Sequence, residues 1–300
     1  MDGGLATHLE TRGHDLSGAL WSAVLLREDP GAVRSAHEDY LRAGAQVLLT
    51  ASYQASVPGF ARLGLDRAQA LALIARSVDV ARQAVQHTGR QAWVAGSVGP
   101  YGAVLAGGQE YTGEYLDPGF AGGHPMTVPS LRAFHRERMA ALADAGADVL
   151  ALETVPALAE AEALLLAAAD VGLPVWLSLT TVVDEDGVVR TRRGEPAAEA
   201  FAMARDVAEV LAVGVNCCDP LGVSAAVTVA ASASGLPVVV YPNSGETWDG
   251  AARRWTGSPD LDLAAVQGWV DAGARLVGGC CRVGPEQVAD LATELGPART

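Results

Sequence analysis

The sequence contains no lysine, and all 21 of its basic residues are arginine. A Schiff base with a carbonyl substrate or with pyridoxal phosphate needs a lysine amine, so Schiff-base aldolases and pyridoxal enzymes are excluded. A Walker A phosphate loop also needs its lysine and is excluded as well. Biased codon usage accounts for the missing lysine, and the chemical exclusions hold whatever its cause.

Positive charge and long apolar runs are scarce too. The net charge is −14 and the isoelectric point about 4.8, so nucleic acid is not an expected partner, whereas a cationic substrate is compatible with the chain. The sequence contains no uninterrupted run of about 18 apolar residues, so we expect no membrane span. The start, "MDGGLATHLE", lacks the basic and apolar regions of a signal peptide. We therefore expect a cytoplasmic protein with no membrane partner.

Cysteine is limited to four residues in two adjacent pairs, Cys217–Cys218 and Cys280–Cys281. Neighbouring Cα atoms lie about 3.8 Å apart, which falls short of ordinary disulfide geometry. In a reducing compartment, clustered cysteines indicate metal binding or catalysis more than disulfides. Two other interpretations stay open: the cysteines are small buried core residues, or they form a redox pair between the two regions.

Seven short apolar runs, each followed by a helical stretch, predict alternating strands and helices. The runs span 46–52, 92–98, 148–154, 174–180, 210–216, 236–242 and 274–280. Continuous apolar runs of this length suit strands that are buried on both faces, as in a parallel sheet. Glycine in stretches such as "LRAGAQ" and "ADVGLP" fits the end of a helix, and Ser130 is expected to cap the helix that follows it.

This alternation predicts one α/β domain over residues 1–300. A (β/α)8 TIM barrel is our first choice; an open doubly wound sheet is second, because no G-x-G-x-x-G follows a strand. The eighth strand of a barrel would directly precede "DGG", so we expect a first strand that is missing or truncated, or a native start upstream of Met1. Segment 99–129, rich in Gly and Tyr, is expected to form a lid or wall of the active site. No long arm or coiled coil indicates an oligomeric state.

Polar side chains follow the predicted strands, and the carboxyl ends of barrel strands meet at one rim. The set comprises Asp2, Ser52, Tyr53, Glu153, Asn216, Cys217, Asn243, Cys280 and Cys281. Thiolates select zinc, and three protein ligands leave one tetrahedral position open, as in catalytic sites. Cys217 directly ends its strand, whereas Cys218 would point elsewhere on an extended chain. We therefore predict Zn²⁺ ligands at Cys217, Cys280 and Cys281.

The remaining rim residues have structural as well as functional interpretations. Glu153 ends a buried strand, where a carboxylate needs a partner, but it could also serve the N-terminus of the next helix. Asp2 could cap a helix or belong to a disordered terminus. Tyr53 and Trp248 fit either the core or a wall that faces a cation.

Seven motifs resemble the zinc-dependent homocysteine S-methyltransferases, in the same order over nearly the whole chain. They are "DGGLAT" at 2, "LTASYQAS" at 49, "SVGPYGAVLAGGQEYTGEY" at 97, "ALETVP" at 151, "GVNCC" at 214, "VYPNSGETWDG" at 240 and "LVGGCC" at 276. The combination of Asn-Cys with a distant Gly-Gly-Cys-Cys is highly specific for this family. "SYQ" and "PNSGE" resemble most the branch that uses S-methylmethionine or S-adenosylmethionine.

The resemblance implies a (β/α)8 barrel that holds one zinc through Cys217, Cys280 and Cys281, with the thiol of homocysteine as the fourth ligand. It further implies that Asp2, Gly3 and Glu153 bind the amino acid end of homocysteine. The betaine-using branch has an aromatic residue near the Glu153 position, where this chain has Thr154 and Val155. Methyl transfer from a sulfonium donor to homocysteine, giving methionine, is the expected activity. A selenium acceptor, a betaine donor, a non-catalytic zinc protein and a thiol redox protein are the alternatives.

Overall fold

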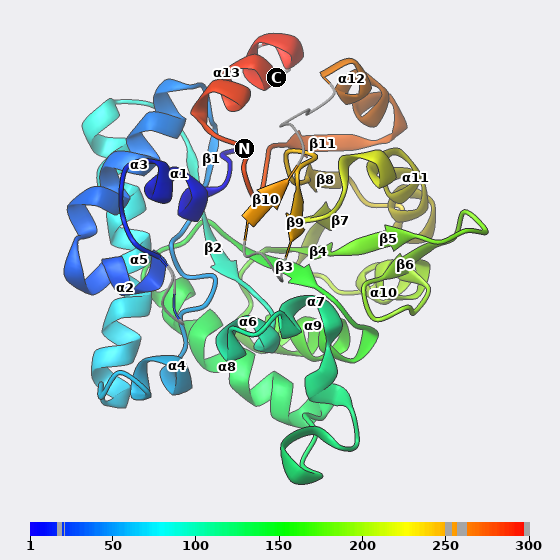
Figure 1. Cartoon of the computed structure of the whole chain (residues 1–300), viewed down its shortest axis with the longest axis horizontal. Helices are drawn as coiled ribbons and strands as arrows, with labels where there is room; N and C mark the ends of the chain where they lie inside the picture. Colours follow the sequence, from blue (N-terminus) through cyan, green and yellow to red (C-terminus); the bar gives the residue numbers. More distant parts are fainter. Residues whose placement is uncertain (17–19, 21, 250–253, 257–262, 297–300) are drawn as a thin grey trace.

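The computed structural model describes residues 1–16, 20, 22–249, 254–256 and 263–296. Its centre is a curled parallel sheet of seven strands, and the helices lie around its outside (Figure 1). The strands, in their order across the sheet, are β1 (Val47–Leu49), β2 (Trp93–Val98), β3 (Val149–Val155), β4 (Val175–Leu179), β7 (Val210–Asn216), β8 (Val238–Tyr241) and β11 (Ala274–Val277). All seven predicted strands are present. The order follows the chain without reversal, which excludes the doubly wound alternative.

The helices occupy the stretches between the strands, as the alternating pattern predicts. They are α1 (Leu5–Thr11), α2 (Ser22–Glu28), α3 (Pro30–Arg42), α4 (Val57–Ala61), α5 (Arg67–Thr88), α6 (Tyr101–Leu105), α7 (Gln109–Thr112), α8 (Val128–Asp144), α9 (Leu158–Val171), α10 (Ala197–Ala204), α11 (Val223–Ser234), α12 (Leu263–Ala272) and α13 (Pro285–Leu295), with short 3₁₀ turns at η1 (Glu114–Leu116), η2 (Phe120–Gly122) and η3 (Pro220–Gly222). Two hairpins, β5 (Thr181–Val183) with β6 (Val189–Thr191) and β9 (Thr247–Asp249) with β10 (Arg254–Thr256), are additions that the sequence analysis missed. Within the described residues, no helix has both the length and the apolar character needed to cross a membrane.

Both faces of the sheet are buried, which explains why the strands are continuously apolar. Along β3, Leu150 and Leu152 belong to the core between sheet and helices, whereas Val149 and Ala151 belong to a second cluster inside the curl. Trp176 fills much of that interior, and its indole N–H donates to the Tyr241 hydroxyl at 3.0 Å. The curled sheet is therefore a packed core, and ligand space is confined to its rim.

Residues 1 and 2 connect the two edges of the sheet. The Met1 ammonium donates to the Val277 carbonyl of β11 at 2.6 Å, and the Asp2 N–H donates to the Val47 carbonyl of β1 at 2.9 Å. In return, the Gly279 N–H donates to the Asp2 carbonyl at 3.0 Å. No strand precedes α1 in the described residues, and this short segment brings the Asp2 side chain to the rim.

Helix ends follow the predicted glycine signal, with one correction at a helix start. The glycines that were expected after helices all have positive φ: Gly44, Gly146, Gly172, Gly235 and Gly273. The cap of α8, however, is Thr127 and not Ser130. Pro129 fits the first turn because its missing N–H would have no intrahelical partner there, so the helix begins earlier and Ser130 becomes the reciprocal partner in a capping box.

The segment 99–129 is anchored to the helices by one buried carboxylate, Glu160 of α9. It accepts the Tyr101 N–H at 2.7 Å, the Tyr115 hydroxyl and the His135 Nε2–H at 2.9 Å. The Arg138 guanidinium can only donate, and it lies 2.9 Å from His135 Nδ1, so the proton of His135 is on Nε2. These bonds fix the segment against α8 and α9.

Replacing Glu160 with alanine should destabilise the protein strongly, because three buried donors would lose their acceptor. We expect a loss of about 3 kcal/mol or more in the free energy of unfolding, measured by chemical denaturation. Glu162 on the same helix is exposed, and Glu162→Ala is the matched control, with an expected change within about 0.5 kcal/mol. Equal stability of the two variants would show that Glu160 does not anchor the segment.

Candidate metal centre

Three thiols from two strand ends meet at the rim of the sheet. The sulfur atoms of Cys217, Cys280 and Cys281 all lie within 4.8 Å of one another, and Cys217 Sγ is 3.7 Å from Cys281 Sγ. Cys217 follows β7, and the two others follow β11. Backbone bonds hold them in place, since the Cys217 N–H donates to the Tyr241 carbonyl at 3.2 Å and the Cys280 N–H to the Pro242 carbonyl at 2.7 Å. This is a group of side chains that could hold one metal ion.

Cys218 lies apart from this cluster, in the core between the sheet and the helices. Burial raises the pKa of its thiol to about 12, so it stays protonated at neutral pH. Backbone conformation separates it from its neighbour: Cys217 has φ of 50°, in the left-handed region, which turns the chain sharply between the two side chains.

Gly278 and Gly279, which precede Cys280, allow neighbouring side chains to pack closely against the backbone. A Cβ on Gly279 would lie 2.2 Å from the Val283 side chain, and one on Gly278 would lie 2.7 Å from that of Met1. Neither glycine has a positive φ. The residue with a positive φ in this loop is Arg282, with φ of 67°. Bulkier residues at 278 or 279 would push the two thiols away from the cluster.

The thiols are electrostatically coupled, and a hydroxyl touches one of them. The pKa of Cys281 is held well below its usual value because Cys217 and Cys280 donate hydrogen bonds to its sulfur. The Tyr111 hydroxyl lies 3.1 Å from Cys217 Sγ. The pKa of Cys280 is raised well above its usual value because its thiol donates hydrogen bonds to Cys217 and Cys281. Three sulfur atoms in one place suit a cation that prefers soft ligands.

Two buried carboxyl groups, Asp2 and Glu153, lie at the same rim and act electrostatically on each other. Burial raises the pKa of Asp2 to about 8 and that of Glu153 to about 7. Asp2 Oδ2 accepts the Leu49 N–H at 2.8 Å, whereas its Oδ1 has no partner among the described residues. Glu153 accepts from the hydroxyls of Ser97 and Tyr241. A bound ammonium group would stabilise both carboxylates.

Three more predicted residues lie at this rim. Ser52 is buried, donates to the Ser97 carbonyl at 2.7 Å and shares a bond of 2.7 Å with the Thr50 hydroxyl. The Tyr53 ring lies against Gly99, where a Cβ would approach it to 2.5 Å. At Gly3 a Cβ would come within 2.3 Å of the Val283 carbonyl oxygen, so the start of the chain packs closely on the loop after Cys281.

The two predicted asparagines support the backbone of the site. Asn216 accepts the Thr154 N–H at 2.7 Å and donates to the Thr154 hydroxyl at 2.7 Å, which braces a residue with φ of 59°. Asn243 Oδ1 accepts the Cys281 N–H at 3.2 Å. Trp248 lies in β9, but its side chain falls outside the described residues.

Two site residues were missed by sequence reasoning, Glu110 and Tyr111, both on the four-residue helix α7. Tyr111 reaches Cys217, as described above. Glu110 is 5% exposed, and burial raises its pKa to about 7, with a further increase from the charge of Cys217. Segment 99–129 thus places the Tyr111 hydroxyl against a thiol, and its role as a lid or wall of the active site stays a prediction. Its general position was readable from its glycines and tyrosines, but no spacing rule singled out these two residues.

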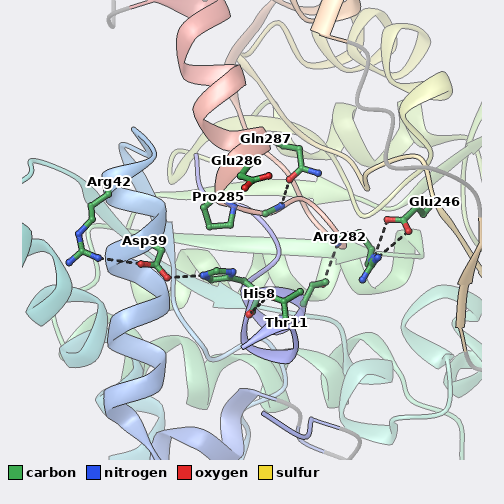
Figure 2. A pocket seen from close by; sticks show the side chains of 11 residues that line it. His8, Thr11, Asp39, Arg42, Glu246, Arg282, Pro285, Glu286 and Gln287 are labelled. Carbon is green, nitrogen blue, oxygen red and sulfur yellow. Dashed lines mark hydrogen bonds and ion pairs between the residues drawn. The ribbon is translucent and has the colours of Figure 1, made fainter. Parts of the chain in front are cut away.

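A cavity of about 630 Å³ lies beside the site, on the outer side of the loop after β11 (Figure 2). None of the thiols lines it. Most of its charged side chains pair with one another: Arg282 with Glu246 at 3.0 Å, and Asp39 with both His8 at 2.9 Å and Arg42 at 3.2 Å. Glu286 also lines the cavity, and no ion pair between described residues includes it. The contribution of the cavity to the site is the Arg282–Glu246 pair, which ties the β8 and β11 loops together.

The rim of this curled parallel sheet thus carries a partly buried cluster of three thiols. The chain belongs to the homocysteine S-methyltransferase family, whose sequence profile matches residues 1–295. The resemblance seen in the motifs is confirmed, and so is the prediction of an enzyme of this class.

Individual relatives agree over almost their full length. Homocysteine S-methyltransferase of Escherichia coli strain K12 is 44% identical over 97% of this chain and 93% of its own, and homocysteine S-methyltransferase 4 of Zea mays is 42% identical over 97% and 87%. Among solved structures, the metallated form of the Escherichia coli homocysteine methyltransferase MmuM superposes with a TM-score of 0.84 at 41% identity, covering 98% of this chain and 94% of that one. Its apo form gives 0.73.

Proposed function

We propose that this enzyme transfers a methyl group from a sulfonium donor to the sulfur of homocysteine and thereby forms methionine. The observation that carries the proposal is the convergence of three thiols beside two buried carboxyl groups. A thiol cluster alone would suit a structural metal site, but Asp2 and Glu153 add what an amino acid substrate needs, which is a negative pocket for its ammonium group. The family membership and the relatives' names agree with this assignment.

Zinc fits the three thiols. A tetrahedral site with Zn–S bonds of 2.3 Å has neighbouring sulfur atoms about 3.8 Å apart, and the Cys217–Cys281 separation is 3.7 Å. We propose Cys217, Cys280 and Cys281 as its ligands, which leaves one position for the substrate thiol. Bound there, zinc would keep that thiol deprotonated at neutral pH, where a free thiol is only a few per cent thiolate.

The protein's own residues would orient the two substrates. Asp2 and Glu153 bind the ammonium of homocysteine, and Asn243 holds the Cys281 backbone in place. The Tyr111 hydroxyl can donate to Cys217 Sγ and stabilise it as a thiolate. Trp176 and Tyr241 close the interior below the site and exclude water. The substrate sulfur supplies the electron pair of the new S–CH₃ bond, and the pair of the broken bond stays on the donor sulfur.

Three finer features belong to the same proposal. The donor is S-methylmethionine or S-adenosylmethionine, which an acidic chain favours because both are cationic sulfonium compounds. The sheet is a closed (β/α)8 barrel, an assignment supported by residues 1 and 2, which bond to both of its edge strands. The enzyme works in the cytoplasm, where a reducing environment keeps four free thiols reduced.

Metal content and product formation test the proposal together. We expect one zinc per chain and methionine formation from homocysteine with at least one of the two sulfonium donors. Zinc without methyl transfer would instead indicate a non-catalytic metal protein. A reversible two-electron titration with little metal would indicate a thiol redox protein.

A further inference from the structure

Glu110 is a buried acid with an unused oxygen. Its side chain sits in the lid helix α7 and is 5% exposed, and Oε2 has no hydrogen-bond partner among the described residues. The carboxylate otherwise accepts hydrogen bonds from two backbone N–H groups, its own and that of Gly108. Burying a carboxylate oxygen without a partner is costly, so a partner beyond the described residues, such as a bound ligand, would explain the arrangement.

The surroundings of Glu110 are negative. Cys217 and Cys281 are near enough to act on it electrostatically, and so is Tyr53. Glu110 does not belong to the group of ligand atoms that meet within 4.8 Å, which contains only the three cysteines. It therefore lies near the three thiols and is not positioned as a ligand of a metal bound by them.

No cation of the described part of the chain neutralises this acid. The salt bridges between described residues do not include Glu110. The neighbouring arginines are engaged elsewhere: Arg192 lies over the Tyr111 ring at 5.5 Å, and Arg138 donates to the carbonyls of Gly99 and Tyr53. Among the described residues, Glu110 therefore has no cationic partner, and a bound cationic ligand could supply one.

The helix that carries Glu110 is held firmly. A Cβ on Gly102 would lie 2.3–2.4 Å from backbone atoms of Gln109 and Glu110, so α6 and α7 are in direct backbone contact. The Tyr111 hydroxyl meets Cys217 on the same side. Glu110 is thus held at a defined place beside the thiols, with Tyr53 and Tyr111 as aromatic neighbours that also favour a cation.

We propose that Glu110 binds the positive sulfonium group of the methyl donor, between the rings of Tyr53 and Tyr111. This assignment rests on the proposed function. During transfer, the new bond forms between the homocysteine sulfur and the methyl carbon. The bond between that carbon and the donor sulfur breaks. Its electron pair stays on the donor sulfur, so the donor becomes an uncharged thioether. Glu110 therefore attracts the substrate more strongly than the product, which assists product release.

A role in binding the donor predicts an effect on the KM for the donor but little effect on kcat. The positive charge of the donor is partly neutralised in the transition state, so Glu110 stabilises the ground state at least as much. Glu110→Gln in the zinc-loaded, full-length protein should raise the KM for S-methylmethionine by about tenfold or more, the effect of losing one charged hydrogen bond. The kcat, the KM for homocysteine and the zinc content should each change by less than about threefold.

Two control variants show whether the effect depends on the carboxylate at position 110. Glu114→Gln removes an exposed carboxylate from the same lid and should leave the donor KM unchanged, whereas Glu110→Asp should recover part of the donor affinity. Calorimetric titration gives a readout apart from turnover. The wild type should bind S-methylmethionine more tightly than uncharged methionine, and Glu110→Gln should lose this preference.

The outcomes distinguish the two proposals. An active wild type with an unchanged donor KM and an unchanged preference for the sulfonium in Glu110→Gln would overturn the role of Glu110 alone. So would a Glu110→Gln variant that loses zinc or homocysteine affinity instead. A wild type that transfers no methyl group from either donor would overturn the proposed function and this inference together.

Discussion

Replacing Cys280 with serine should remove the metal and the methyl transfer activity together while the fold remains. A serine hydroxyl stays protonated at neutral pH and is a poor ligand for a soft site. Structural zinc sites bind with about 10–16 kcal/mol, so the loss of one of a few ligands should weaken binding by at least about 100-fold. We expect less than a tenth of the wild-type zinc after dialysis against a weak chelator, and no measurable turnover.

Cys218 offers the matched control for this experiment. It is adjacent to a predicted ligand in the sequence, yet it lies in the apolar core, away from the other thiols. Cys218→Ala should keep one zinc per chain and near-normal kcat, with a modest loss of stability of about 1 kcal/mol. If Cys280→Ser retained full zinc and full turnover, or if Cys218→Ala lost its zinc, the proposed ligand set would be wrong.

Replacing Glu153 with glutamine should weaken homocysteine binding far more than metal binding. The variant keeps the size of the side chain but loses the charge that would pair with the substrate ammonium. A hydrogen bond to a charged group is worth about 1.5–3 kcal/mol, so we expect the KM for homocysteine to rise by about 10- to 100-fold. Zinc content should stay at the wild-type level. An unchanged KM would remove Glu153 from the substrate site.

The pH dependence gives a second measure of the same carboxyl group. Burial raises the pKa of Asp2 to about 8 and that of Glu153 to about 7, so as the pH falls the free enzyme loses the charge of Asp2 first and that of Glu153 through pH 7. Since kcat/KM reports the ionisation of free enzyme, its value for homocysteine should fall by up to about tenfold per pH unit below 7. Glutamine mimics the protonated acid, and Glu153→Gln should therefore show a shallower acid limb than the wild type.

The sequence predicted the strands and the thiol cluster because both leave strong local signals. Each strand is a continuous apolar run, and Leu150 and Val149 are both buried although they face opposite sides. Cysteines at the ends of such runs are brought together by the topology alone. The separation of Cys217 from Cys218 also follows from local geometry. The positive φ of Cys217 that turns the chain there could not be predicted from its residue type.

Long-range packing explains what the sequence did not reveal. Glu110 lies in a short glycine-flanked helix that has no apolar periodicity, and its burial depends on the close approach of Gly102 to Gln109. The bracing of Thr154 by Asn216 joins residues 62 positions apart. The first strand was predicted over 46–52 but ends at Leu49, because Thr50 and Ser52 turn to bond with each other and with β2.

With a metal bound by the three thiols as proposed, the left-handed backbone at Thr154, Cys217 and Arg282 would tie the amount of folded enzyme to the supply of that metal. Each such residue costs roughly 1–2 kcal/mol, against a total stability of about 5–15 kcal/mol for an ordinary domain. A cation that binds only the folded chain offsets this cost by mass action. In a cell short of zinc, the enzyme should not only be idle but also be degraded faster, so that its abundance would follow the metal.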